Sequence, residues 1–268
     1  MKNVLTIAGS DSSGGAGIQA DLKTFCAHGV FGMSVITAVT AQNTQGVLAV
    51  QDIDQDIIAK QIEAIFEDIA VDAVKIGMVS SRETVATIAA KLRQYRAVNI
   101  VIDPVMISKS GYHLLRTDAE QALLGELLPL AALITPNIPE AEVIAGVKIE
   151  TPADMEMAAR RIRELGARQV LVKGGHLPAD EAATDVLYDG SRFRYFEGRR
   201  IATKNTHGTG CTLSSAIAAN LGRGLPVEEA VQRAKEYITT AIEHSLAIGH
   251  GAGPTHHFYE LYRKAGME

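Results

Sequence analysis

Short apolar runs that alternate with helical patterns constrain the fold of this chain more than any other feature of its sequence. The runs are rich in β-branched residues, and in most of the segments between them apolar residues repeat at helical spacing. Strand-like runs occupy residues 4–8, 33–40, 47–53, 73–76, 99–102, 133–135 and 170–172. Strands that alternate with helices are typical of a parallel sheet sandwiched by helices. The sequence therefore predicts an α/β fold with a mostly parallel central sheet.

Residues 184–200 interrupt this alternation. Two strand-like runs in this segment flank Asp189-Gly190, a dipeptide that is typical of a tight hairpin turn. We therefore expect an antiparallel hairpin at one edge of the sheet. No repeat, low-complexity tract or change in composition divides the chain, so residues 1–268 are expected to form one domain.

Capping signals mark several helix starts. Helices are expected to begin at or near Ser80, Thr117, Thr151, Pro226 and Thr255. The first two of these residues are each followed three positions later by a glutamate, which is the pattern of a capping box. Thr151 is followed by a proline, which is favoured at the first helical position.

Composition excludes several classes of partner. The 268-residue chain is 47% hydrophobic, which is enough for a substantial core. A formal charge of -5 argues against a broad basic surface for nucleic acid. Cys26 and Cys211 are far apart in the sequence and form no metal-binding motif, which fits a reducing compartment. No signal peptide or membrane span is recognisable, so we expect a cytoplasmic protein that acts on a small molecule, with neither a membrane nor a nucleic acid as its partner.

The strand ends indicate where a ligand would bind. In parallel α/β sheets, ligands bind beyond the carboxyl ends of the strands. Polar, glycine-bearing segments follow the strands that end at Ala8, Ile76, Ile102, Thr135 and Val172. These segments are expected to converge on one cleft.

Residues 204–215 are predicted to form a tight loop that leads into a helix. Gly208-Thr209-Gly210 precede an Ala/Leu-rich helical pattern. Free backbone N–H groups and the positive end of the helix dipole would point the same way, which suits a phosphate or the charge that develops during its transfer. Cys211 falls in the first turn, where this field favours the thiolate and predicts a lowered cysteine pKa. The structural alternative is a buried, unreactive cysteine.

Three charged residues beyond the strand ends suit phosphoryl transfer. Carboxylates such as Asp103 and Glu140 can hold Mg²⁺ directly or through water, because Mg²⁺ uses few protein ligands. Lys173 can neutralise nucleotide phosphates. Taken singly, each residue could equally be a helix cap, a solvated loop residue or a member of a surface ion pair. Their shared placement favours a phosphoryl-transfer site.

Two common nucleotide-binding patterns fail a specific check. Residues 15–20 fit the G-x-G-x-x-A pattern of a dinucleotide-binding loop, but no Asp or Glu occurs between Leu22 and Gln51 to bind the ribose. No lysine follows a glycine anywhere in the sequence, so the P-loop pattern is absent as well. Any nucleotide phosphates must bind through another loop.

The motifs taken together closely resemble those of the hydroxymethylpyrimidine/phosphomethylpyrimidine kinases of thiamine biosynthesis. The resemblance covers nearly the whole chain in order. The stretches that carry it are Thr6–Asp21, Thr40–Thr44, Lys75–Met78, Asp103–Met106, Thr135–Ala141, Lys173–His176 and Thr206–Cys211.

The resemblance implies a ribokinase-like three-layer sandwich that forms a single α/β domain, and usually a homodimer. It also implies ATP and Mg²⁺ as cofactors and two successive reactions in one pocket. ATP first phosphorylates the hydroxymethyl group of 4-amino-5-hydroxymethyl-2-methylpyrimidine, and a second ATP then converts the monophosphate to the diphosphate.

The resemblance also assigns roles to individual residues. Cys211 stands where sugar kinases of the superfamily carry an aspartate base, so it is implied to be the general base. Gly208, Thr209 and Gly210 would form the anion hole. Gln42 would read the pyrimidine, because its amide offers a donor and an acceptor side by side.

The remaining implied positions fall into three groups and one loop. The substrate pocket would include Asp21, Gly9 and Met78, of which Met78 provides apolar packing. ATP would be bound by Lys173, Asn137 and Thr206. The metal would be held by Asp103 and Glu140. Residues 108–113 would cover the site and exclude water.

Other functions stay open at this point. A pyridoxine or pyridoxal kinase would share the glycine-rich loops, although Gln42–Thr44 favours the pyrimidine. A binding domain without activity would keep the fold, but Cys211 and Lys173 argue against it. A zinc site is a weaker alternative, because no spacing joins His256-His257 to either cysteine.

Overall fold

The computed structural model describes residues 1–106, 117–175, 177 and 183–267. The expected covering loop, residues 108–113, lies outside the described residues.

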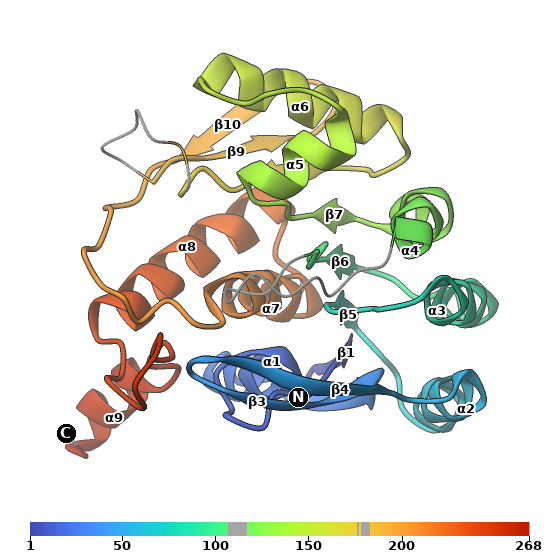
Figure 1. The fold of residues 1–268 in the computed structure, drawn as a ribbon, viewed down its shortest axis with the longest axis horizontal. Coiled ribbons are helices and arrows are strands. Elements are labelled where there is room, and N and C mark those ends of the chain that lie inside the picture. The colour runs from blue at the N-terminus through green and yellow to red at the C-terminus, as the bar shows by residue number, and fades with distance from the viewer. Residues whose placement is uncertain (107–116, 176, 178–182, 268) are drawn as a thin grey trace.

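A central eight-stranded sheet runs through the molecule (Figure 1). Its strands, in spatial order, are β10 (Phe193–Phe196), β9 (Asp185–Tyr188), β8 (Val170–Val172), β7 (Leu133–Ile134), β6 (Ile100–Ile102), β5 (Ala73–Ile76), β1 (Asn3–Ala8) and β2 (Phe31–Ile36). From β8 to β2, all neighbouring strands are parallel, whereas β9 pairs antiparallel with both β8 and β10. The parallel sheet and the antiparallel edge hairpin are both confirmed.

Helices cover both faces of this sheet, which gives the expected three layers (Figure 1). One face packs against α1 (Gly17–Ala27), α7 (Thr209–Gly222) and α8 (Val227–Glu243). The other face packs against α2 (Gln55–Phe66), α3 (Arg82–Gln94), α4 (Thr117–Ala122), α5 (Ile138–Ala145) and α6 (Pro152–Glu164). Short helical turns at Leu123–Leu127 and Leu128–Leu130 follow α4, and α9 (Tyr259–Ala265) lies near the C-terminus.

Two separate core clusters follow from the alternation of side chains along the strands. In β5, Val74 and Ile76 belong to the cluster under α2 and α3, whereas Ala73 belongs to the cluster under α7 and α8. Lys75 therefore points to the α7 face, where it is fully buried. A lysine at this position in an otherwise apolar strand becomes part of the wall below the helix that carries Cys211.

The run at residues 33–40 forms two strands rather than the single one expected. The break falls at Thr37, whose N–H donates to the carbonyl of Ala8 at 3.0 Å and whose hydroxyl donates to the carbonyl of Met78 at 2.8 Å. Beyond it, β3 (Ala38–Asn43) leaves the central sheet and pairs antiparallel with β4 (Gly46–Asp52) in a separate two-stranded sheet. This turn away from the central sheet carries Gln42 to the cleft.

Most expected helix starts hold, with two corrections. Ser81, rather than Ser80, caps α3 and accepts a hydrogen bond from the N–H of Thr84, while Ser80 donates to Asp52 instead. The last helix starts at Tyr259 and not at Thr255. At α6, Thr151 and Asp154 form a capping box. The capping box expected at Thr117 is not among the described contacts, because the side chain of Thr117 lies outside the described residues.

Candidate active site

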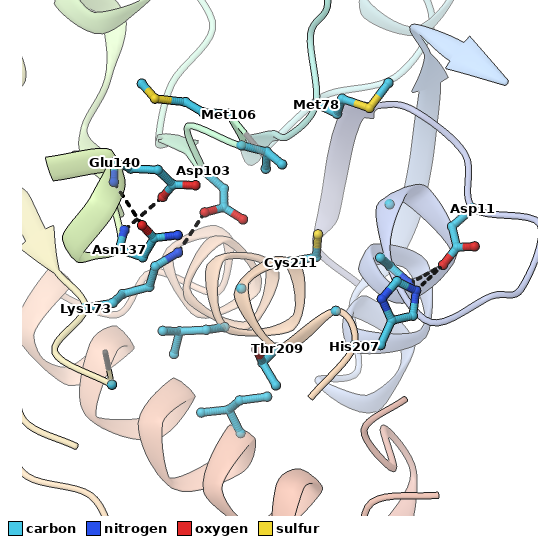
Figure 2. A pocket seen from close by; sticks show the side chains of 18 of the residues that line it. Asp11, Met78, Asp103, Met106, Asn137, Glu140, Lys173, His207, Thr209 and Cys211 are labelled. Carbon is cyan, nitrogen blue, oxygen red and sulfur yellow. Dashed lines mark hydrogen bonds and ion pairs between the residues drawn. The ribbon is translucent and has the colours of Figure 1, made fainter. Parts of the chain in front are cut away.

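A single cavity of about 580 Å³ brings most of the expected site residues together (Figure 2). Its walls come from segments that follow β1, β5, β6, β7 and β8, from β3, and from the start of α7. The expected residues that line it are Gly9, Gln42, Met78, Asp103, Asn137, Glu140, Lys173, Gly208, Thr209, Gly210 and Cys211. Asp21 and Thr206 are not among the lining residues.

Gly208 caps the start of α7 in a conformation that favours glycine. Its φ is +75°, and a Cβ at this position would lie 1.8 Å from the carbonyl oxygen of Gly15. The close approach of these two loops sets the direction in which α7 leaves its first turn. Thr206 stands before this turn, and its carbonyl accepts a hydrogen bond from the N–H of Thr209 at 3.4 Å. Thr206 therefore supports the loop from outside the cavity.

Cys211 faces the cavity, but its thiol is not acidified. Burial raises the pKa of the Cys211 thiol to about 11, while the positive charge of Lys75 acts against this shift. The carboxylates of Asp21 and Asp103 raise the pKa further, and a hydrogen bond from the backbone N–H of Gly17 lowers it. The lowered pKa predicted from the helix dipole is therefore wrong, because desolvation outweighs the field of the helix N-terminus.

Asp21 lies beneath the cavity in a buried ion pair with Lys75. Lys75 Nζ is 2.9 Å from Asp21 Oδ2, and neither side chain is exposed. The hydroxyls of Thr6 and Ser215 donate to the same carboxylate at 2.6 and 2.7 Å. Burial alone would lower the pKa of Lys75, but the carboxylate of Asp21, together with Cys211 and Asp103, raises this pKa above its usual value. Lys75 lines the cavity as a charged ammonium, and Asp21 holds it there.

A second cation lies at the other end of the cavity. Lys173 Nζ is 2.9 Å from Asp103 Oδ1 (Figure 2). Burial alone would lower the pKa of Lys173, but Asp103 and then Glu140 raise it, so the ammonium stays charged. Burial raises the pKa of Glu140 to about 7; Lys173 lowers this pKa and Asp103 raises it. Two carboxyl groups therefore share one lysine.

The capping of helix α5 fixes the position of Glu140 beside Lys173 and Asp103. The side chain of Asn137 accepts a hydrogen bond from the N–H of Glu140 at 3.0 Å, and Glu140 Oε2 accepts one from the N–H of Asn137 at 2.8 Å. This capping box starts α5 at the cavity. Asn137 also forms an isolated parallel bridge with Lys173. The cap therefore places a carboxyl group and a lysine on one wall.

The carboxyl groups suit one mode of metal binding. Within the described ranges, no group of three or more His, Cys, Asp or Glu side chains is placed to hold a metal ion. Mg²⁺ keeps several waters and binds through one or two carboxylates together with substrate phosphates. Asp103 and Glu140 fit that mode and do not form an all-protein cage.

Sequence reasoning missed a further buried ion pair in the wall. Lys235 Nζ donates to Asp185 Oδ2 at 2.7 Å and to the carbonyl of Ala183 at 2.6 Å. Asp185 Oδ1 accepts a hydrogen bond from the N–H of Gly174 at 2.9 Å, so the pair fixes the segment that follows Lys173. The position of Lys235 in the middle of an amphipathic helix gave no signal of this role.

The opposite end of the cavity is formed by Gly9, Gln42 and Met78. A Cβ at Gly9 would lie 3.0 Å from Met78 Cε, so the sulfur side chain packs directly on this loop. Ser12 Oγ donates to the carbonyl of Gln42 at 2.7 Å and accepts from its N–H at 2.9 Å. Gln42 Oε1 accepts a hydrogen bond from Thr40 at 3.2 Å. These contacts fix the backbone of Gln42 at the cavity.

One of the two adjacent histidines has ordinary surroundings. His257, one of the adjacent histidines, is buried with Nε2 3.1 Å from the hydroxyl of Thr212, and burial lowers its pKa to about 4.

None of the helices that the structure describes has the length and apolar character needed to cross a bilayer.

The fold and this cavity define a ribokinase-like phosphotransferase. A family model for phosphomethylpyrimidine kinase matches residues 11–256, so the chain belongs to this family. It is 55% identical over 262 residues to the hydroxymethylpyrimidine/phosphomethylpyrimidine kinase of Rhizobium meliloti, with 97% of this chain and 98% of the relative covered. It is also 53% identical to a thiamine biosynthesis bifunctional protein, ThiED, of Geobacter sulfurreducens, but it spans only 52% of that protein's length.

Two solved structures are close to this fold. An ADP complex of Bacillus subtilis pyridoxal kinase superimposes with a TM-score of 0.90 at 42% identity, covering 97% of this chain and 99% of that one. A phosphomethylpyrimidine kinase from Clostridium difficile superimposes with a TM-score of 0.81 at 54% identity, covering 90% and 100%. The relative with the higher sequence identity has the lower TM-score, so the shape of the backbone does not select the substrate.

Proposed function

We propose that this chain phosphorylates 4-amino-5-hydroxymethyl-2-methylpyrimidine with ATP and then phosphorylates the monophosphate to the diphosphate. The observation that carries the proposal is the position of the α7 N-terminus. It lies in one cavity between a small end with Gln42 and Met78 and a charged end with Lys173 and Asp103. An alcohol at the first end and a nucleotide phosphate at the second would meet at the first turn of α7.

The proposed roles at the meeting point follow from the chain's own groups. The backbone N–H groups at Gly208, Thr209 and Gly210 would receive the charge of the migrating phosphoryl group. Cys211 would take the proton of the acceptor hydroxyl in its thiolate form, which Lys75 and the Gly17 N–H favour and burial opposes. Phosphoryl transfer has a loose transition state, so positioning contributes more than the strength of the base.

ATP and Mg²⁺ fit the charged end. Lys173 and Asn137 would face the nucleotide phosphates, and Asp103 and Glu140 would hold the metal directly or through water. Mg²⁺, when bound, neutralises the charge on the phosphates. The related pyridoxal kinases were solved with ADP in Bacillus subtilis and with the nucleotide AMP-PCP in Staphylococcus aureus, which supports a nucleotide as the phosphoryl donor.

The acceptor would be recognised at the small end. Gln42 would pair with a ring nitrogen and the adjacent amino group of the pyrimidine through its side-chain amide. Gly9 and Met78 would enclose the ring, since they already pack on one another. Asp21 would act from below through Lys75 and would not touch the ring.

A second candidate is a pyridoxal kinase activity at the same site. The 42% identity of this chain to Bacillus subtilis pyridoxal kinase, over 97% of its length, favours this candidate. Identities of 43% to 55% to curated hydroxymethylpyrimidine/phosphomethylpyrimidine kinases favour the pyrimidine as the main substrate.

We also propose that the enzyme forms a homodimer and works in the cytoplasm. Val39 in β3 and Leu48 in β4 are 48% and 78% exposed, and exposed apolar side chains on this small sheet suit a homodimer contact. Cys26 and Cys211 are both free thiols, which suits the cytoplasm.

The test compares kcat/KM for the aminopyrimidine alcohol and for pyridoxine, with ATP and Mg²⁺, and identifies the phosphorylated products by mass spectrometry. A pyrimidine preference together with the appearance of the diphosphate supports the proposal. A preference for pyridoxine of about tenfold or more, equal to 1.4 kcal/mol in transition-state binding, overturns it in favour of the second candidate.

A further inference from the structure

Two glycine-bearing loops meet at the cavity through the buried pair Asp11 and His207. The first loop follows β1, and the second leads into α7 (Figure 2). His207 Nε2 lies 2.8 Å from Asp11 Oδ2, with the two side chains only 10% and 2% exposed. Both residues line the cavity, yet neither has a part in the proposed proton or phosphoryl transfer.

Asp11 organises the first loop. Its Oδ1 accepts hydrogen bonds from the N–H and the hydroxyl of Ser13 at 2.8 and 2.7 Å, and its Oδ2 accepts from the N–H groups of Gly15 and Ala16 at 3.0 and 2.8 Å. Buried carboxylates that accept several N–H bonds form strong, well-directed contacts. The bond from His207 is therefore anchored in a loop that cannot easily move.

His207 connects this loop to the start of α7. Its backbone N–H donates to the carbonyl of Gly253 at 3.1 Å, so the backbone is held as well as the ring. A Cβ at Gly15 would lie 2.3 Å from His207 Cδ2, which shows how closely the ring packs on the first loop. The next residue, Gly208, makes its own close approach to Gly15 and caps α7. Any shift of His207 would therefore move the proposed anion hole.

The first loop also reaches the proposed base. The backbone N–H of Gly17 donates a hydrogen bond to Cys211. Gly9, which belongs to the proposed acceptor end, accepts a hydrogen bond from the N–H of Ile18 at 3.0 Å. One loop thus contacts both the acceptor end and the first turn of α7.

We propose that Asp11 and His207 are positioning residues that hold the anion hole and Cys211 in register with the acceptor-binding loop. The inference rests on the proposed roles of Gly208 to Cys211. A positioning pair affects the chemical step more than the binding of either substrate, because both ends of the cavity keep their own contacts. A displacement of about 1 Å between reacting groups costs on the order of 100-fold in rate.

The test uses two histidine replacements that differ in reach. In His207→Gln, the side-chain nitrogen occupies about the same place as Nε2 and can still donate to Asp11. In His207→Asn, the nitrogen is one bond closer to the backbone and cannot. We expect His207→Asn to lower kcat by about 10- to 100-fold while KM for ATP and for the acceptor changes less than about threefold. His207→Gln should restore most of the lost rate.

A double-mutant cycle tests whether the two residues act together. Asp11→Asn combined with His207→Asn should lower kcat little more than either change alone, because each already breaks the same link. Additive losses overturn the proposal. So does a rise in acceptor KM with kcat unchanged, which would mean that His207 binds the substrate directly, and so does equal loss in the Gln and Asn variants.

A readout without turnover separates this proposal from the proposed function. In a Cys26→Ser background, the rate of Cys211 alkylation at one pH should change several-fold in His207→Asn and stay near the parent value in His207→Gln. If the alkylation rates differ in this way but the protein phosphorylates neither acceptor, the proposed function is wrong and the positioning role is retained. Unchanged alkylation in both variants would sink the positioning role alone. Matched melting temperatures of the variants exclude unfolding as the cause.

Discussion

The two ends of the cavity are held by different kinds of force. At the end that carries Lys173, opposite charges sit within hydrogen-bond distance of one another, and buried carboxyls share the cation. At the end that carries Gln42, the contacts are hydrogen bonds to the backbone and apolar packing between Gly9 and Met78. One end is organised by electrostatics and the other by shape.

This difference separates nucleotide binding, which kinases with different acceptors share, from selectivity for the acceptor. A nucleotide triphosphate brings several negative charges, and a cluster of cations and metal-binding carboxylates suits it whatever the acceptor is. An aminopyrimidine and a pyridoxal differ in the polar edge of a ring, and only the shaped end can read that edge. The solved pyridoxal kinase with nearly the same backbone agrees with this division.

The largest effect is expected at Cys211, where the two ends meet. Cys211→Ala should lower kcat by about 100- to 10,000-fold, the usual contribution of a general base. Because burial raises the pKa of the Cys211 thiol to about 11, the thiolate fraction increases with pH, and kcat/KM of the parent enzyme should increase between pH 7 and pH 9. The residual activity of the alanine variant should not show this increase. Steady-state kinetics over that pH range provide the measurement.

Cys26→Ser is the matched control for this prediction, because Cys26 is exposed and lies outside the cavity. Its kinetics should equal those of the parent. An alanine variant that retains parental kcat would remove Cys211 from the mechanism and leave catalysis to positioning alone.

The charged end is expected to give the next largest effect. Lys173→Met should lower kcat/KM for ATP by about 100- to 1,000-fold, because it removes a cation from the phosphates and leaves Asp103 and Glu140 without their shared partner. Loss of Lys173 also removes a charge that lowers the pKa of Glu140, so Mg²⁺ binding should shift to higher pH. Kinetics with varied ATP and Mg²⁺ measure both effects.

Lys148→Met provides the control, since Lys148 is 84% exposed and pairs with Glu142 on the surface. A change at Lys173 that alters acceptor KM as much as ATP KM would contradict the division between the two ends.

The shaped end should affect selectivity rather than rate in general. Gln42→Ala removes the side-chain amide and should lower kcat/KM for the aminopyrimidine by about 10- to 100-fold, the cost of leaving polar groups of a bound substrate unpaired. Activity on pyridoxine should change less than about threefold, so this second acceptor is an internal control. Equal losses on both acceptors would show that Gln42 supports the loop and does not read the ring.

Part of this arrangement could be predicted from the sequence because it follows from local patterns. The period of apolar residues placed the parallel strands, and Asp189-Gly190 placed the edge hairpin. Since the carboxyl ends of parallel strands meet at one edge, the same pattern also brought Asp103 and Lys173 together.

Other parts depend on three-dimensional burial, which a local pattern does not contain. The helix N-terminus argued for an acidic Cys211, but the desolvation that raises its pKa comes from chain segments distant in sequence. The resemblance implied that Asp21 lies in the substrate pocket. In the structure, the side chain of Asp21 pairs with Lys75 and does not line the cavity. The lone lysine in an apolar strand was the available signal, since a charge in a buried strand requires a partner.

The smallest expected effect concerns stability and again separates the two ends. Burial would raise the pKa of Asp11, but the hydrogen bond from His207 and those of Ser13 lower it from 3.8 to about 2. A carboxyl whose folded pKa is depressed adds stability above its unfolded pKa and loses it as pH falls through its folded pKa. Asp11 should therefore contribute about 2 kcal/mol above pH 4, and this contribution should disappear between pH 4 and pH 2.

Glu140 should show the opposite sign at the charged end. Burial raises its pKa from 4.5 to about 7, so its contribution to stability is present below pH 4.5 and is lost as pH rises through 7. Urea unfolding of the parent, Asp11→Asn and Glu140→Gln at a series of pH values measures both terms. Asp11→Asn should flatten the loss of stability on the acid side of the profile, and Glu140→Gln should flatten the loss of stability between about pH 4.5 and pH 7. If both variants changed the same side, the two ends would share one electrostatic network, and the contrast between a shaped end and a charged end would not hold.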